Sequence, residues 1–234
     1  MAKVAIVTGS ATGLGAACAV DLAGRGWNVA INYTKSKKEA DETYAAVKAK
    51  GVDAILVQAD MGQDADCRRL AAETMKKWGR IDGLINNAGT LGPARQSSFD
   101  MDFEGWIATF RVNTLAPLAV SQALLPNLRA GEHPKILTIS SGMGSMSSTQ
   151  SDRLAYRSSK AAVNKVMQGL ATDLKGEGIA VAVCHPGWVK TDMGGSDADI
   201  SPEMSATGIA RIVDHMSLSR SPAFHVWDGG FLPW

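Results

Sequence analysis

Short apolar runs and amphipathic helical stretches alternate along the chain, with glycine at many of the crossings. The first run, residues 3–7, carries Val, Ala and Ile without polar alternation, which is typical of a parallel strand buried on both faces. Such alternation predicts a doubly wound parallel sheet with right-handed crossovers. We therefore expect an α/β fold in which residues 1–234 form one domain, with about seven strands and helices on both faces of the sheet.

The same patterns predict where each element lies. Pro117 should kink or split the fourth helical stretch near Leu115, because proline lacks the amide proton that a helix interior needs. Strands are expected at residues 3–7, 27–32, 53–58, 81–86, 135–140, 179–184 and 223–227. Helices are expected at 16–23, 37–50, 64–78, 103–128, 153–175 and 202–216.

Composition excludes several classes of function. Lys and Arg number 24 and Asp and Glu 23, so no charge excess points to nucleic acid or to an anionic membrane. The three cysteines are far apart and form no metal-binding or disulfide pattern, which indicates reduced thiols in a cytoplasmic protein. No apolar run has the length of a membrane span, and the N-terminal run is too short for a signal peptide.

A glycine-rich segment, residues 8–15, connects the first expected strand to the first helix. Gly9 permits a sharp turn, Gly13 lets the backbone approach a pyrophosphate, and Gly15 removes a side chain where helix meets strand. The helix N-terminus would then direct free N–H groups at the phosphates. The spacing is TGxxxGxG rather than GxGxxG. A connection without a ligand is the less favoured alternative, because a strand and a helix flank the segment as a nucleotide-binding turn requires.

The residues after the second strand bear on which dinucleotide binds. Enzymes of this architecture that use NAD usually place an acidic residue there for the ribose 2′-hydroxyl. Here Asn32, Tyr33 and Thr34 are followed by Lys35 and two further lysines, at 37 and 38. These groups suit a 2′-phosphate, so NADP(H) is favoured and NAD(H) remains possible. The alternative is a solvated basic start to a helix, which the helix dipole disfavours.

Tyr156 and Lys160 lie four residues apart on an expected helix and therefore share one face of it. An ammonium beside a phenol favours the phenolate, so we expect the pKa of Tyr156 to fall from about 10 towards neutrality. Such a side chain can transfer a proton at working pH. Ser140 and Ser141 end a buried strand, where a hydroxyl could hold a substrate oxygen opposite the phenol.

Five motifs together make the chain resemble the short-chain dehydrogenases/reductases over essentially its full length. The later part is most similar to the branch of C-factor and sniffer-type carbonyl reductases, and the resemblance implies a single-domain Rossmann fold. The motifs are Thr8-Gly9-x3-Gly13-x-Gly15, Asn86-Asn87-Ala88-Gly89, Asn113, Ser141 with Tyr156-x3-Lys160, and Pro186-Gly187.

The resemblance implies roles for four residues. Tyr156 would be the acid/base, Ser141 would bind the carbonyl or alcohol oxygen, and Lys160 would lower the tyrosine pKa and hold the ribose hydroxyls. Asn113 would kink a helix and position a water molecule in a proton relay. Ser141 is preferred to Ser140 because the family usually has the second serine of the pair in this role.

The resemblance also implies a cofactor site and oligomers. Homodimers or homotetramers are common among such proteins, and no metal is expected. The expected cofactor contacts are Gly9, Ser10, Thr12, Gly13, Leu14, Gly15, Asn32, Tyr33, Thr34, Lys35, Asp60, Met61, Asn87, Ala88, Gly89, Tyr156, Lys160, Pro186, Gly187, Val189 and Thr191.

These observations predict an NAD(P)H-dependent oxidoreductase that interconverts a carbonyl and an alcohol on a small molecule. A regulatory or signalling protein that binds a dinucleotide is the main alternative, but nothing in packing demands all four expected catalytic residues. A Ser/His/Asp hydrolase is weaker, because Ser141 lacks a GxSxG context and His185 fits better as a strand-end residue. Residues 191–201 are expected to form a mobile lid. The Trp-rich residues 224–234 would either close the pocket or form a subunit contact.

Overall fold

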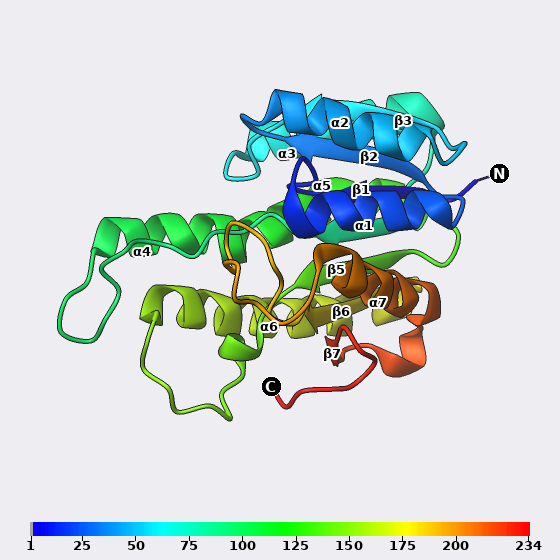
Figure 1. Ribbon diagram of the computed structural model, residues 1–234. Helices are drawn as coiled ribbons and strands as arrows, with labels where there is room; N and C mark the ends of the chain where they lie inside the picture. The colour runs from blue at the N-terminus through cyan, green and yellow to red at the C-terminus, as the bar shows by residue number, and fades with distance from the viewer. Residues whose placement is uncertain (1) are drawn as a thin grey trace.

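Seven strands form one parallel sheet in the computed structural model, which describes residues 2–234 (Figure 1). Their order is β3-β2-β1-β4-β5-β6-β7, and every neighbouring pair is parallel. The predicted doubly wound α/β fold is therefore confirmed. The strands are β1 (Val4–Val7), β2 (Asn28–Tyr33), β3 (Ala54–Gln58), β4 (Gly83–Asn86), β5 (Lys135–Ile139), β6 (Ala180–His185) and β7 (Phe224–Val226).

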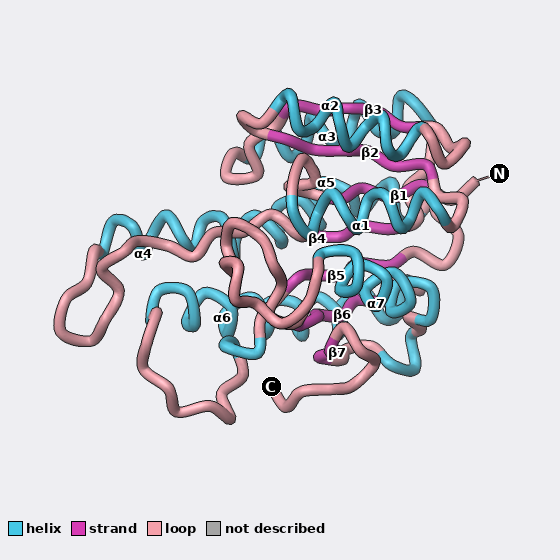
Figure 2. The backbone as a smooth tube through the Cα atoms, in the orientation of Figure 1, coloured by secondary structure: helices cyan, strands magenta, loops and turns pink. Residues whose placement is uncertain are grey.

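Helices cover both faces of the sheet (Figure 2). One hydrophobic cluster joins α3, α5 and α6 to one face, and a second joins α1, α2 and α7 to the other. The α-helices are α1 (Gly13–Gly24), α2 (Lys37–Lys48), α3 (Asp64–Trp78), α4 (Phe103–Phe110), α5 (Ala116–Arg129), α6 (Leu154–Leu174) and α7 (Pro202–His215).

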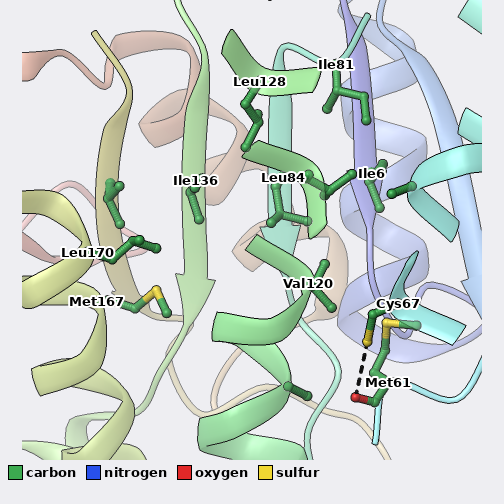
Figure 3. Close-up of a cluster of buried hydrophobic side chains, with 14 of the residues drawn as sticks. Ile6, Met61, Cys67, Ile81, Leu84, Val120, Leu128, Ile136, Met167 and Leu170 are labelled. Carbon is green, nitrogen blue, oxygen red and sulfur yellow. Dashed lines mark hydrogen bonds between the residues drawn. The ribbon is translucent and has the colours of Figure 1, made fainter. Parts of the chain in front are cut away.

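The sheet is buried on both faces, which explains its uninterrupted apolar strands. All four residues of β1 are buried. Ile6 packs with Leu84 and Ile136 in the cluster beneath α5 and α6 (Figure 3), whereas Ala5 and Val7 belong to the opposite cluster. Successive side chains of a strand point to opposite faces, so both faces need apolar residues when helices cover both.

The predicted break near Leu115 takes the form of a π-helical segment. After α4 the chain forms a π-helix over Arg111–Leu115, and α5 starts at Ala116 with Pro117 in its first turn. Proline is tolerated there because the first amide groups of a helix have no intrahelical acceptor. Other boundaries differ by a few residues. Helix α1 begins at Gly13 rather than at 16, because the Thr12 carbonyl in the glycine turn already accepts a helical bond from the Ala16 amide, at 3.2 Å.

Two further expectations concern the three cysteines and membrane-spanning helices. The three cysteines are free and buried. No helix within residues 2–234 combines the length and the apolar character needed to cross a membrane.

Candidate active site

The residues singled out in the sequence lie at the carboxyl ends of β1 to β6 and on the helical segments that carry Asn113, Tyr156 and Lys160. The strand order reverses between β1 and β4, because β1 pairs with β2 on one side and with β4 on the other. Open α/β sheets bind their ligands outside the carboxyl ends of the strands at such a reversal. The topology therefore places the glycine turn after β1 beside the segment that follows β4.

The glycine turn has the shape of a phosphate-binding loop. Gly9 and Gly13 adopt left-handed backbone angles, with φ of +62° and +55°, which side chains other than glycine rarely adopt. A Cβ at Gly15 would lie 2.3 Å from the Gly9 carbonyl oxygen and 2.4 Å from Asn87 Nδ2. Thr12, the N-cap of α1, makes no side-chain capping bond, and the first turn carries no acid. The first backbone N–H groups of α1 therefore have no side-chain acceptor. Together with the positive end of the helix dipole they fit a pyrophosphate.

Ser10 and Asn32 shape this turn through bonds inside the protein. Asn32 Oδ1 accepts from the Gly9 amide at 2.9 Å, and Asn32 Nδ2 donates to the Ala59 carbonyl at 2.9 Å. Ser10 Oγ donates to the Val7 carbonyl and accepts from the Asn32 amide. Both residues are almost fully buried. Their side chains therefore position the loop rather than face a ligand.

The end of β2 leaves basic groups in solvent. Tyr33 is buried, and Thr34 donates through Oγ1 to the Ala59 carbonyl at 3.3 Å. Lys37 forms an ion pair with Asp41. Lys35 is exposed and takes part in none of the ion pairs among residues 2–234.

The two residues expected beside an adenine differ in their surroundings. The Asp60 side chain is exposed and accepts from the Gly62 amide at 2.9 Å. Met61 is buried in the core, where its carbonyl faces the Cys67 thiol at 3.6 Å (Figure 3). A ligand can therefore meet Met61 only through its backbone.

The segment after β4 is tied to the glycine turn by Thr8 and Asn87. The Thr8 hydroxyl accepts from the amides of Asn87 and Ala88, at 3.0 and 3.1 Å. Asn87 Nδ2 donates to the carbonyls of Thr8 and Gly9. A Cβ on Gly89 would lie 3.3 Å from Asn113 Oδ1 and 3.7 Å from Lys160 Nζ. This segment therefore links the glycine turn to the Tyr156 side of the site.

Asn113 lies in the π-helix and is 1% exposed. Its side chain exchanges two hydrogen bonds with the backbone of Thr90, at 2.9 and 2.8 Å, and donates to Ser159 Oγ at 3.0 Å. It thereby fastens the loop after β4 to α6. Such π-segments often mark functional positions in helices.

Tyr156 and Lys160 project from α6 into the buried side of the site. They are 8% and 4% exposed, and Lys160 Nζ lies 5.8 Å from the centroid of the Tyr156 ring. Lys160 Nζ donates to the carbonyl of Ile139 at the end of β5, at 2.8 Å. The predicted shared face is thus confirmed, but the strongest polar contact of the ammonium is a carbonyl oxygen.

The two serines after β5 have different partners. Ser140 Oγ donates to Asn164 Oδ1 at 2.5 Å and is 2% exposed. Ser141 Oγ accepts from the Met143 amide at 3.2 Å, in a 3₁₀ turn, and its hydroxyl faces the Tyr156 phenol. This difference supports Ser141 as the serine that meets a substrate.

The predicted fall in the pKa of Tyr156 is wrong in this structure. Burial raises the pKa of Tyr156 above its usual 10.0, and the nearby Ser141 hydroxyl and Arg153 guanidinium oppose that rise only in part. Burial also lowers the pKa of Lys160 to about 8. Charging either group inside the protein is costly. The prediction counted the attraction between the two groups and left out the loss of water.

The segment from Pro186 to Thr191 lies against the glycine turn. A Cβ on Gly13 would be 3.2 Å from Thr191 Cγ2. Gly187 has φ of +84°, and a Cβ there would be 2.6 Å from Ile200 Cδ1. Val189 forms an isolated bridge with Ile200, so both ends of the expected lid are tied together. Trp188 Nε1 donates to the Gly194 carbonyl at 2.8 Å, within the loop.

The residues of the hydrolase alternative and the C-terminal segment have structural contacts. His185 ends β6 as expected, and among residues 2–234 its buried Nδ1 has no hydrogen-bond partner.

The C-terminal segment packs against the chain near Ser141. Ser145 Oγ donates to the Pro233 carbonyl at 2.7 Å, and the Trp234 ring packs on Phe224 at 5.7 Å. Residues 227–234 therefore fold back along β7, the edge strand of the sheet, beside the turn that follows Ser141.

The sequence analysis placed Thr8 in the glycine turn without its bonds to Asn87 and Ala88, and it missed Thr90 and Asn164 as parts of this site. Asn164 had a detectable signal, because it follows Lys160 by four residues on the same helical face as Tyr156. Thr90 had none, because its partner Asn113 is distant in the chain.

Comparison with known proteins gives concordant matches. The family model described as short chain dehydrogenase matches residues 3–200. The protein called C-signal from Myxococcus xanthus is 40% identical over 157 residues, which are 67% of this chain and 94% of that protein.

Two solved structures share the whole fold. The NADPH-bound carbonyl reductase from chicken fatty liver has a TM-score of 0.91 at 27% identity, and the match covers 100% of this chain and 99% of that one. The carbonyl reductase Sniffer of D. melanogaster has a TM-score of 0.88 at 25% identity, with 100% of both chains covered. The expected similarity to sniffer-type carbonyl reductases is thereby confirmed.

Proposed function

This chain belongs to the short-chain dehydrogenase family, and we propose that it is an NADP-dependent oxidoreductase that interconverts a carbonyl and an alcohol. The observation that carries this proposal is the convergence of Ser141, Tyr156 and Lys160 in one buried corner beside a loop shaped for pyrophosphate. Nothing in the packing of the sheet requires these three side chains together.

Each polar side chain has a defined task in the proposed reaction. A bound NADP(H) would supply or accept the hydride, which the protein itself cannot do. Ser141 would donate its hydroxyl proton to the substrate oxygen and hold that oxygen near the phenol. Tyr156 would transfer the proton, and its position in the protein interior excludes competing water. Lys160, with a pKa lowered by burial to about 8, would exchange a proton near working pH.

The cofactor preference rests on groups at the end of β2. Thr34 and Lys35 are exposed there, no acidic side chain takes their place, and Lys35 is free of ion pairs among residues 2–234. A 2′-phosphate would gain a cation that a free hydroxyl cannot use. The chicken carbonyl reductase of the same fold is described as NADPH-bound, which supports the same preference.

The regulatory alternative is not favoured. The relative called C-signal carries a name that suggests signalling, but the two solved structures described above are named as carbonyl reductases. A complete set of acid/base groups also has no use in a protein that only binds a nucleotide. One domain over residues 1–234 and a homodimer or homotetramer stay predictions.

The deciding experiment is a fluorescence titration with NADPH and with NADH, followed by turnover of a panel of aldehydes, ketones and quinones. We expect NADPH to bind more tightly and to be oxidised by some member of the panel. Exchanging Lys35 for Glu should narrow or reverse the preference for NADPH. Tight binding of NADPH without turnover of any carbonyl would revive the regulatory alternative.

A further inference from the structure

A hollow of about 630 Å³ opens beside the N-terminus of α6. Its walls are residues 91–97, with Asp100, Asp152 and Arg153. Gln96 joins the hollow to the acid/base residue, because its Oε1 accepts from the Tyr156 amide at 3.1 Å. The volume falls within the range of about 300–1,000 Å³ that small-molecule pockets occupy. The hollow therefore adjoins the backbone of Tyr156 and has room for part of a substrate.

Two carboxylates line the hollow, and each is paired with an arginine other than Arg153. Asp100 Oδ1 accepts from Arg95 at 3.0 Å. Asp152 Oδ1 accepts from Arg157 through both Nε and Nη2, at 3.1 and 2.6 Å. Arg153 is exposed and enters none of the ion pairs among residues 2–234. A surplus positive charge therefore remains at this wall of the hollow.

The backbone of Arg153 is held in an unusual conformation. It is the N-cap of α6 with φ of +52° and ψ of +48°, a left-handed geometry that residues with a Cβ adopt at a cost. Arg157 holds the neighbouring residues in place, since its Nε donates to the Asp152 carbonyl at 2.8 Å and its Nη2 to Gln150 Oε1 at 2.7 Å. Strained positions of this kind gather at ligand-binding sites.

Arg153 also lies within electrostatic reach of the phenol. Arg153 is the N-cap of the helix that carries Tyr156, and Gln96, which lines the same hollow, accepts from the Tyr156 amide. The positive charge of Arg153 acts to lower the pKa of Tyr156 against the larger effect of burial. A molecule that lies in the hollow would therefore present an anionic group to Arg153 while its carbonyl reaches Tyr156.

We propose that Arg153 binds an anionic group of the carbonyl substrate, a carboxylate or a phosphate, and so selects substrates that carry one. A guanidinium suits this task because it donates two parallel hydrogen bonds to either anion. The proposal rests on the oxidoreductase function above and adds a substrate class to it. It predicts that the carbonyl and the anion lie at opposite ends of the bound molecule.

The test compares matched substrates that differ only in charge. Oxo acids of increasing chain length are compared with their methyl esters, and hydroxyketone phosphates with the free hydroxyketones. We expect the wild-type kcat/KM to favour the charged member of one pair by about tenfold or more, the value of one charge-assisted contact. The pair that shows the preference identifies the anion as carboxylate or phosphate.

Three variants separate this role from general damage. Arg153→Gln should reduce the charged-to-neutral ratio of kcat/KM to about one. Arg153→Lys should restore part of the preference for the charged substrate, because lysine keeps the positive charge but lacks the two parallel N–H donors of a guanidinium. Arg95→Gln changes an arginine of the same hollow that already has a carboxylate partner, so the ratio should stay as in wild type. Arg153→Gly should also lose the preference while the protein melts no lower, since glycine accepts the backbone angles.

A binding measurement separates failure of this proposal from failure of the oxidoreductase function. The preferred anion is titrated by calorimetry into wild type and Arg153→Gln, each loaded with NADP⁺. If both proteins turn over with the same charged-to-neutral ratio of kcat/KM, the role of Arg153 is overturned and the oxidoreductase function stands. No turnover, but anion binding that disappears in Arg153→Gln, would uphold the anion site and overturn the oxidoreductase. Binding that is equal in both proteins would overturn the anion site.

Discussion

The glycine turn after β1 and the corner around Tyr156 use their polar groups in opposite ways. At the turn, the side chains of Ser10, Asn32 and Asn87 are spent on neighbouring backbone, and the free N–H groups at the start of α1 are left for a ligand. At Tyr156 the backbone amide donates to Gln96 Oε1 and the carbonyl accepts from Ser159 Oγ, while the phenol faces the Ser141 hydroxyl. A nucleotide common to many enzymes can be met by backbone, whereas a reaction needs specific side chains.

The comparison predicts that removing one side-chain oxygen stops the chemistry without disturbing nucleotide binding. Tyr156→Phe keeps the ring in the core and loses only the hydroxyl, so turnover should fall by about 10² to 10⁴-fold. NADPH affinity, measured by fluorescence, should stay within a few-fold of wild type. Turnover close to that of wild type would remove Tyr156 as the acid/base.

Lys160 tests the cost of placing a charge in this corner. Its folded-state pKa of about 8 lies below the 10.5 of an ordinary lysine. The unfolded chain therefore holds more protons between these values, so this residue makes the free energy of unfolding rise with pH across that window. The gain is up to ~3 kcal/mol. Urea unfolding at about pH 7.5 and about pH 10 measures it.

Lys160→Met is the matched control for that rise, because it keeps an apolar chain of similar length and removes the titrating group. The free energy of unfolding of the variant should not show this rise with pH. The variant should be at least as stable as wild type near neutral pH. If both proteins gain equally between the two pH values, the pKa of Lys160 is not lowered in the folded chain.

Gly15 tests the backbone half of the comparison. A Cβ there would meet the Gly9 carbonyl at 2.3 Å, whereas a Cβ on Gly24, at the far end of the same helix, would meet nothing within 4 Å. Gly15→Ala should lower the free energy of unfolding by ~1–3 kcal/mol and weaken NADPH binding. Gly24→Ala should leave binding unchanged and stabilise the helix by ~0.5–1 kcal/mol. Equal behaviour of the two variants would show that the turn tolerates a side chain.

Ser140 and Ser141 give the smallest expected effects and the finest distinction. Ser141→Ala should lower kcat/KM about tenfold, the value of one hydrogen bond to a developing charge, with little change in stability. Ser140→Ala should act mainly on stability, by ~1–3 kcal/mol, because it leaves Asn164 Oδ1 buried without its donor. Reversed effects would exchange the roles of the two serines.

Local patterns were enough to predict the architecture and the location of the site. Continuous apolar runs indicated strands covered on both faces, and the spacing of Tyr156 and Lys160 placed them on one helical face. The π-segment was not predictable, although Pro117 marked the break. That segment depends on bonds from Asn113 to Thr90 and Ser159, which only the folded chain brings together.

The chemistry of the site was harder to predict than its location. The pKa of Tyr156 was expected to fall, yet burial dominates, and burial is a property of the whole fold. The side chains of Ser10 and Asn32 were expected to contact the cofactor. Instead, Ser10 Oγ accepts from the Asn32 backbone amide and Asn32 Oδ1 accepts from the Gly9 amide, so both position the glycine turn. Residue type and spacing show that polar groups gather, but not which of them already have partners.

Asn32 has a consequence for anyone who wishes to redesign this protein for the cheaper coenzyme NAD. The obvious substitution places an acid at Asn32, near the carboxyl end of β2. Its amide nitrogen, however, donates to the Ala59 carbonyl, and its oxygen accepts from Gly9. A carboxylate at this position would place an acceptor oxygen against the Ala59 carbonyl oxygen, where Asn32 now donates. The resulting repulsion would disturb the glycine turn, which both coenzymes need. Redesign of the coenzyme preference should therefore begin at the solvent-facing Thr34 and Lys35.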